Sequence, residues 1–198
     1  DELISTVIPY LSLDRDYEAI RADINSRTDS DWLKKAGECA RGIAILRQEP
    51  WEALLSFIIS QNNNIPRIKG IIRKISLQYG ECIAIKKGLD ACPFNKISGT
   101  PCEEKCESCG ACYTFPSARD ILENPEKLLF ANPGFRYGYM CDAALKVASG
   151  EIDFQKIKDG ASYEFTLECL KKIKGVGDKV ASCVALFAFE NLDAFPID

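Results

Sequence analysis

The chain has 198 residues, of which 46% are apolar and 27% are charged, and its net charge is −4 at pH 7. This balance is ordinary for a globular protein. It argues against a generally basic coat for nucleic acids, although binding depends on where the charges lie. Histidine is absent, which excludes serine-histidine and cysteine-histidine triads, histidine general bases and zinc sites with imidazole ligands.

The apolar stretches are too short to cross a membrane. Val180 to Phe189 is interrupted by Ser182 and falls well below the ~20 apolar residues that a transmembrane helix needs. No basic region followed by an apolar segment opens the chain. We therefore expect an intracellular protein with no membrane partner. Because the sequence begins at Asp1 and stops at Asp198, we also expect flanking segments in the natural protein.

Apolar residues recur at helical spacing in three stretches. They are Trp51, Leu54, Leu55, Ile58 and Ile59 after Pro50; Ile68, Ile71, Ile72 and Ile75 after Pro66; and Phe165, Cys169, Leu170 and Ile173 before Gly175. Spacings of three and four indicate helices, and the two prolines are typical of a helix start. The fold is therefore expected to be mainly α, with "ECIAI" (81–85) as a weak candidate strand.

Two short runs are basic although the whole chain is acidic. "RIKGIIRK" (67–74) has four cations and no acid, and "KKIKGVGDK" (171–179) has four lysines against Asp178. Taken alone, each run is equally consistent with a solvated helix face and with an anion-binding face.

Five of the ten cysteines fall between residues 92 and 112: Cys92, Cys102, Cys106, Cys109 and Cys112. Their short spacings allow several thiolates to converge on one ion, and "CESCG" resembles a zinc knuckle. We expect four of the five to bind structural zinc, with an iron-sulfur cluster as the less favoured metal centre and disulfides or free thiols as the alternative. The scattered Cys39, Cys82, Cys141 and Cys169 are expected to be small buried hydrophobes.

Residues 164–189 have the pattern of helix, two-glycine turn and helix, which is a helix-hairpin-helix. Gly175 and Gly177 allow the backbone to turn tightly and to approach a ligand, so that amides at the start of the second helix can point at a phosphate. A plain connector between two helices is the alternative, because glycine-x-glycine turns are common.

Lys179 lies in the first turn of the second helix, where positive potential favours a neutral amine that can act as a nucleophile. The helix N-terminus, Lys172 and Lys174 would contribute this potential. Asp198 follows "AFPI" and is a candidate to orient the lysine, to take up its proton or to stabilise a cationic sugar-like transition state.

Three separated motifs together resemble the 8-oxoguanine DNA glycosylases of the helix-hairpin-helix superfamily. They are "SQNNNIPRIKGII" (60–72), "NPGFRYGY" (132–139) and "IKGVGDKVASCVALFAFENLDAFPID" (173–198). They occur in the order of that family, and the resemblance covers the whole chain apart from the cysteine-rich insertion. It implies the helix-hairpin-helix DNA glycosylase fold and excision of 8-oxoguanine from damaged double-stranded DNA.

The resemblance also implies roles for residues at the hairpin. Lys179 would be the nucleophile that displaces the base and forms a Schiff base, with Asp198 as its acidic partner. Cys183, one helical turn beyond Lys179, would pack against the face of the extruded base. The hairpin residues Gly175, Gly177 and Val180 would hold DNA phosphate through backbone amides, with a bound monovalent or divalent cation.

The other motifs are matched to contacts with the rest of the lesion site. Asn62 would enter the space that the base vacates, and Arg67 and Arg136 would hydrogen-bond the unpaired cytosine. Phe135 would be an aromatic wedge in the DNA step beside that cytosine. Read singly, "NNN" is consistent with a helix cap and "GFRYGY" with an ordinary aromatic turn.

The expected organisation has three parts: residues 1–44 as a helical segment leading into the catalytic domain, 45–180 as a helical domain that contains the 92–112 insertion, and 181–198 as the start of a second, truncated helical lobe. The family's N-terminal α+β domain is expected to be absent. Lys174 stands where the family commonly has proline, and the insertion is not a general family feature.

We expect a monomer in the cytoplasm, nucleoid or nucleus, without an organic cofactor. The alternatives are a lysine-dependent glycosylase for another damaged base and a non-catalytic DNA-binding module.

Overall fold

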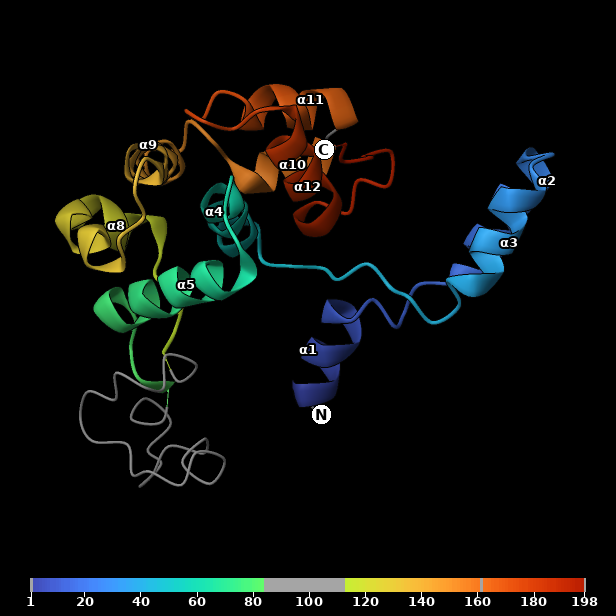
Figure 1. The fold of residues 1–198 in the computed structure, drawn as a ribbon, viewed down its shortest axis with the longest axis horizontal. Coiled ribbons are helices and arrows are strands. Elements are labelled where there is room, and N and C mark those ends of the chain that lie inside the picture. The colour runs from blue at the N-terminus through green and yellow to red at the C-terminus, as the bar shows by residue number, and fades with distance from the viewer. Residues whose placement is uncertain (1, 84–112, 161, 198) are drawn as a thin grey trace. The chain divides into compact units, whose positions relative to one another are not determined.

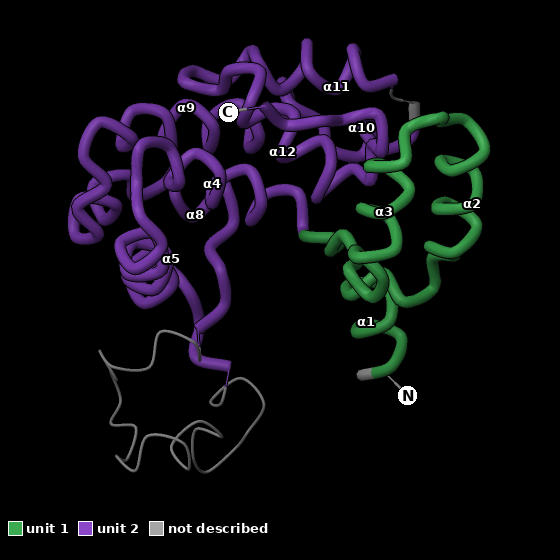
Figure 2. The backbone as a smooth tube through the Cα atoms, turned by 45° about the vertical axis from the view of Figure 1, so that its right-hand side comes forward, with its two compact units in different colours: residues 1–48 green, residues 49–198 purple. Residues whose placement is uncertain are grey.

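The computed structural model describes residues 2–83, 113–160 and 162–197 (Figure 1). The expected metal-binding cysteines of residues 92–112 and the expected catalytic Asp198 lie outside these residues. The described part of the chain is helical and contains no β-strand, so the prediction of a mainly α fold is confirmed. It divides into two compact units, residues 1–48 and 49–198 (Figure 2). The three-part organisation expected from the sequence stays a prediction.

Unit 1 contains three helices, which are α1 (Glu2–Tyr10), α2 (Tyr17–Arg27) and α3 (Asp31–Cys39). The side chains of Asp16 and Ser30 cap α2 and α3 by accepting an amide of the first turn. The hydroxyl of Tyr17 accepts the amide of Ile45 at 2.9 Å, which holds the segment after α3 against α2.

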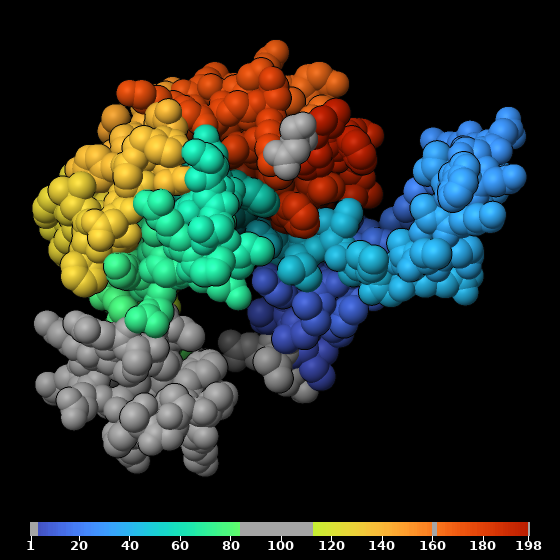
Figure 3. All heavy atoms as spheres, in the orientation of Figure 1, coloured from blue at the N-terminus to red at the C-terminus, as the bar shows by residue number. Residues whose placement is uncertain are grey.

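Unit 2 contains the other described helices, and among all the described helices none is long and apolar enough to span a membrane. They are α4 (Pro50–Ser60), α5 (Ile65–Tyr79), α8 (Ala118–Glu123), the 3-10 helix η2 (Pro125–Ala131), α9 (Arg136–Ala148), α10 (Phe154–Gly160), α11 (Tyr163–Leu170) and α12 (Asp178–Ala188). Helix α5 packs against η2, and their surfaces adjoin in the green and yellow areas of Figure 3.

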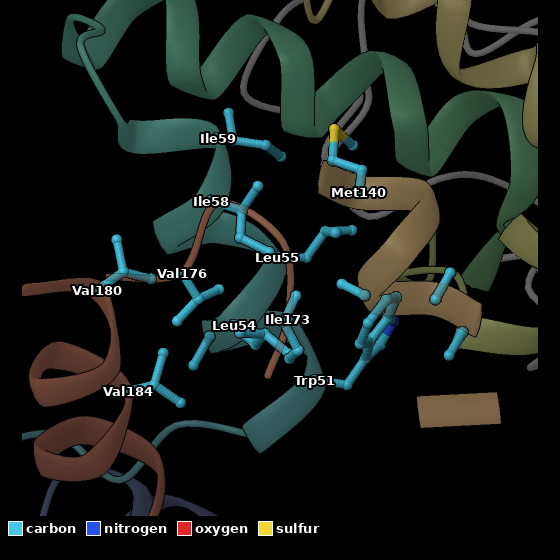
Figure 4. Close-up of a cluster of buried hydrophobic side chains, with 14 of the residues drawn as sticks. Trp51, Leu54, Leu55, Ile58, Ile59, Met140, Ile173, Val176, Val180 and Val184 are labelled. Carbon is cyan, nitrogen blue, oxygen red and sulfur yellow. The ribbon is translucent and has the colours of Figure 1, made fainter. Parts of the chain in front are cut away.

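Helix α4 is the centre of the hydrophobic core and contacts α5, α9 and α12. Its buried side chains are Trp51, Ala53, Leu54, Leu55, Ile58 and Ile59. They share one cluster with Val180 and Val184 of α12, Met140 of α9 and the hairpin residues Ile173 and Val176, and Figure 4 labels all of these side chains except Ala53. The indole of Trp51 donates a hydrogen bond to the carbonyl of Pro116 at 2.8 Å, so its one polar atom is satisfied.

The starts of α4 and α5 follow from local sequence. Pro50 occupies the first turn of α4, and the Glu49 carboxylate accepts the amides of Trp51 at 3.1 Å and Glu52 at 2.7 Å. Asn64 caps α5 by accepting the amide of Arg67 at 3.0 Å. Both helices therefore begin where the sequence predicts.

The residues on the two sides of the segment 84–112 pair with each other. Cys82 and Tyr113 form an isolated antiparallel bridge, and the amide of Thr114 donates to the carbonyl of Glu81 at 3.0 Å. This bridge is the pairing observed within the candidate strand 81–85, of which the structure describes 81–83.

The scattered cysteines are less buried than the sequence predicts. Cys39 is exposed, so the expectation is wrong there because α3 turns this position toward solvent. Cys82, Cys141 and Cys169 are partly buried. Burial raises the pKa of the Cys141 thiol, although Tyr137 donates a hydrogen bond that lowers it.

The closing bridge gives a stability prediction. A Cβ atom at Gly80 would lie 2.0 Å from the carbonyl oxygen of Thr114, so Gly80→Ala must displace the backbone that closes the segment. We expect it to lower the free energy of unfolding by about 1–3 kcal/mol.

The matched control is Gly70→Ala in the interior of α5, where a Cβ meets nothing within 4 Å. That substitution should stabilise by about 0.5–1 kcal/mol. Urea denaturation of both variants is the measurement. Equal effects on the free energy of unfolding would contradict the close approach of Gly80 to the Thr114 carbonyl.

Candidate active site

The hairpin joins α11 to α12 through residues 171–177. Gly175 has a φ of +81°, and a Cβ there would lie 2.3 Å from the ring of Tyr139. Both the left-handed backbone and the packing therefore require glycine. The amide of Lys174 donates to the Asp142 carboxylate at 2.7 Å, and Val176 is buried. The predicted helix-hairpin-helix is thus present, and α9 supports its turn.

Gly177 differs from Gly175 because a Cβ at this position would meet nothing within 4 Å and its φ is −97°. It is the N-cap of α12 and, as a glycine, makes no side-chain capping hydrogen bond. The start of α12 carries the positive end of the helix dipole. Absence of a side chain at Gly177 leaves room for close approach by an anionic ligand.

The first turn of α12 is held by polar contacts on two sides. Lys171 forms an ion pair with Asp178 at 2.6 Å across the hairpin. On the other side, the buried Ser182 hydroxyl donates to the carbonyl of Asp178 at 2.7 Å and lies 2.8 Å from the hydroxyl of Tyr163. These contacts connect α11 to the turn that carries Lys179.

A cleft of about 630 Å³ lies between the end of α4 and the start of α12. Lys179 and Cys183, one helical turn apart, both line it, and Cys183 is 8% exposed. The full lining consists of Phe57, Ser60, Gln61, Asn62, Gly177, Asp178, Lys179, Val180 and Cys183. The structure therefore brings an amine, a thiol and the N-terminus of α12 to one cavity.

The turn between α4 and α5 forms the opposite wall. Asn62 is exposed and has a φ of +46°, a left-handed conformation that asparagine tolerates better than most residues. The Asn63 amide donates to the carbonyl of Ile59 at 3.0 Å, and Asn64 is the cap of α5. The helix-cap interpretation of "NNN" is therefore confirmed for Asn64. Asn62, by contrast, lines the cleft.

Arg136 lies inside the protein, with 2% of its surface exposed. Its guanidinium donates to the carbonyls of Gln61 and Asn62 at 2.9 Å and to that of Pro133 at 3.1 Å. It also lies 4.4 Å from the ring centroid of Phe135. Burial and the charge of Arg67 lower the pKa of Arg136. In this conformation the side chain fastens the cleft-lining turn to the start of α9.

Arg67 and Phe135 are more accessible than Arg136. The Arg67 side chain is exposed and donates a long hydrogen bond of 3.4 Å to the carbonyl of Asn132. The ring of Phe135 is 56% exposed and meets Tyr139 edge-to-face at 5.9 Å. A Cβ at Gly134 would lie 4.0 Å from both guanidinium groups, so Arg67 and Arg136 flank the same glycine. The described residues thus gather one accessible cation, one buried cation and one accessible ring.

The sequence did not single out three residues that line the cleft, Phe57, Ser60 and Gln61. Phe57 and Ser60 lie near the end of α4, and Gln61 follows as its C-cap, directly before Asn62. The signal that could have found them is their position, because residues beside a site residue at a helix end face the same opening.

The hairpin and the helical arrangement define the class of helix-hairpin-helix DNA glycosylase folds. A 3-methyladenine DNA glycosylase from Archaeoglobus fulgidus shares the fold, with a TM-score of 0.66 and 18% identity over 98% of this chain.

Closer similarities identify the family within that class. An N-glycosylase/DNA lyase from Saccharomyces cerevisiae is 30% identical over all of this chain and 49% of its own length. The apo 8-oxoguanine glycosylase/lyase from Clostridium acetobutylicum (33% identity, TM-score 0.79) and MBOgg1 bound to a low-affinity DNA ligand (35%, TM-score 0.75) each match the whole chain and 60% of their own. The chain belongs to the 8-oxoguanine DNA glycosylase family. It spans about half the length of the curated relatives that it matches.

The family model for the 8-oxoguanine DNA glycosylase N-terminal domain matches residues 1–54. This match corrects the expectation that the N-terminal domain is absent, because residues 1–54 carry sequence of that domain. The described part of this range forms α1 to α3 and the first turn of α4, with no strand.

The two hairpin glycines should respond differently to substitution. Gly175→Ala should lower the melting temperature, because its Cβ would overlap the Tyr139 ring and its φ is positive. Gly177→Ala should leave the melting temperature unchanged, since its Cβ enters open space. Thermal unfolding followed by circular dichroism measures both, and equal losses would contradict this geometry.

Proposed function

We propose that the chain carries the catalytic core of a base-excision repair enzyme, a DNA glycosylase and abasic-site lyase that removes 8-oxoguanine from duplex DNA. The observation that carries the proposal is the position of Lys179, in the first turn of α12 and in the same cleft as Cys183. Its relatives are N-glycosylases and DNA lyases, and the Clostridium relative has been described with DNA that contains cytosine opposite 8-oxoguanine.

In the proposed reaction the neutral amine of Lys179 attacks C1′ of the damaged nucleotide. A bond forms between Nζ and C1′ while the bond from C1′ to the base breaks, and the base leaves with the bonding electron pair and gains a proton. Opening of the sugar ring gives a Schiff base. Loss of a proton from C2′ then expels the 3′ phosphate by β-elimination. Asp198 would orient the amine, take up its proton and stabilise positive charge on the sugar.

The hairpin would bind the DNA backbone. Backbone amides around Gly175, Gly177 and Val180 would hold a phosphate, with a bound cation completing the contact. The open space at Gly177 supports close approach of the backbone to the ligand. Such contacts position the duplex without reading its sequence.

The remaining site residues would handle the opened base pair. Cys183 would pack against the face of the extruded base, and Asn62 would fill the space left in the duplex. Phe135 would wedge beside the unpaired cytosine, and Arg67 would donate hydrogen bonds to it. For Arg136 to join Arg67 at the cytosine, its guanidinium would first have to leave the carbonyls of the α4–α5 turn.

We also propose that four of the cysteines Cys92, Cys102, Cys106, Cys109 and Cys112 bind structural zinc, because thiolates are preferred zinc ligands. An iron-sulfur cluster is the alternative. The enzyme would act as a monomer inside the cell and without an organic cofactor.

The reaction is tested by borohydride trapping on duplexes that contain different damaged bases opposite cytosine or adenine. We expect a covalent adduct with 8-oxoguanine opposite cytosine, and we expect Lys179→Gln to lower excision by more than ~10³-fold and to abolish the adduct. Adduct formation with another lesion alone would favour a glycosylase of different base preference. Binding that ignores the lesion and gives no adduct would favour a non-catalytic DNA-binding module.

Substitution of Arg67 and substitution of Arg136 should affect different properties, the first the preference for the opposite base and the second the stability of the fold. Arg67→Gln should reduce the preference for cytosine over adenine opposite the lesion by about tenfold and leave stability unchanged, because its side chain is exposed. Arg136→Gln should lower the free energy of unfolding by at least ~2 kcal/mol, since the carbonyls of Gln61, Asn62 and Pro133 lose their donor. Single-turnover excision and urea denaturation distinguish the two, and a change in preference with unchanged stability for Arg136→Gln would argue against its buried role.

The metal proposal is tested by native mass spectrometry before and after chelation. One zinc ion per chain is expected, and the double substitution Cys106→Ser with Cys109→Ser should remove it. Cys39→Ser is the control and should retain the ion, because Cys39 lies outside the cluster. A chain that carries no metal would overturn the proposal, and the visible absorption of an iron-sulfur cluster would identify the alternative.

A further inference from the structure

Gln61 is a polar residue in the cleft that the proposed reaction does not use. It follows α4 directly, as its C-cap, and lines the cleft together with Lys179 and Cys183. The Nε2 atom of its carboxamide is buried and has no hydrogen-bond partner among the described residues. A buried donor without a partner costs free energy, so a side chain of this kind in a cleft calls for a functional explanation.

The backbone of Gln61 is held by hydrogen bonds although the Nε2 atom of its side chain has no partner among the described residues. Its carbonyl oxygen accepts hydrogen bonds from Nε of Arg136 at 2.9 Å and from Nη2 of the same buried guanidinium. These hydrogen bonds restrain the backbone and not the torsions of the Gln61 side chain. The terminal torsion of glutamine is broad and roughly two-fold, so a half-turn exchanges the positions of Nε2 and Oε1.

We propose that Gln61 is a base-reading residue whose carboxamide pairs with the lactam edge of the base bound in the cleft. This inference rests on the proposed function. A lactam presents an N–H beside a carbonyl, and a carboxamide offers the complementary acceptor and donor. The contact is in the plane of the base, whereas Cys183 would lie against its face. Gln61 would thus distinguish bases by hydrogen bonding, and Arg136 would hold it in position.

Two substrates separate base reading from a structural role. The first is a duplex with 8-oxoguanine opposite cytosine, and the second is the same duplex with a preformed abasic site at the lesion position. Because the second substrate has no base, a residue that contacts only the base matters for excision and not for β-elimination. The variants are Gln61→Leu, which removes both polar atoms, and Gln61→Glu, which keeps the shape and removes the donor.

We expect both variants to slow single-turnover excision by at least about tenfold, as loss of a substrate hydrogen bond does, and to leave β-elimination at the abasic site within about twofold. The matched control is Gln78→Leu on α5, outside the cleft lining, which should change neither rate. Unchanged excision in the Gln61 variants, or equal losses on both substrates, would overturn the inference.

Failure of the proposed function gives a different pattern. A wild-type chain that processes neither substrate would overturn the proposed function. The inference on Gln61 is then decided by binding, measured as the affinity ratio between lesion-containing and undamaged duplexes in the Lys179→Gln background. A ratio that Gln61→Leu lowers by about tenfold supports base reading, and an unchanged ratio overturns it.

Discussion

The packing of α4 against α12 is the contact on which the candidate site depends. Leu54, Leu55 and Ile58 on α4 are fully buried in the same cluster as Ala181 and Val184 on α12. Full burial of a side chain the size of leucine contributes about 1.5–3 kcal/mol, more than an exposed polar contact does. Since the cleft lies between the end of one helix and the start of the other, this apolar contact sets the separation of its walls. The turn that carries Lys179 is therefore placed by apolar side chains of the core.

Helix α9 supports both sides of the cleft. Near its start, Arg136 binds the carbonyls of the turn that follows α4. One turn further on, the ring of Tyr139 fills the space beside Gly175, and Asp142 accepts the amide of Lys174. The turn and the hairpin, which face each other across the cleft, thus share one rigid support. This arrangement meets a general requirement of a nucleophilic site, which is that the attacking group be held in place before the substrate arrives.

Much of this fold follows from local patterns in the sequence. The proline-led helix at Pro50, the hairpin glycines and the shared position of Lys179 and Cys183 depend on residues close in sequence, where spacing determines which face a side chain occupies. The burial of Arg136 could not be predicted in this way, because two of its three acceptors, the carbonyls of Gln61 and Asn62, lie 75 and 74 positions earlier. Every residue has a backbone carbonyl, so the residue types give no signal for such a contact. The Gln61 carboxamide was missed for a related reason, since only the folded turn reveals which polar atoms lack partners.

The proposed reaction requires that Lys179 be the residue that bonds to the sugar. The most direct test is tandem mass spectrometry of the borohydride-reduced complex after proteolysis, which identifies the lysine that carries the deoxyribose remnant. Three other lysines, at positions 171, 172 and 174, lie in the same hairpin and provide an internal control. We expect the added mass to lie on Lys179 alone. An adduct on another lysine, with Lys179 unmodified, would contradict it.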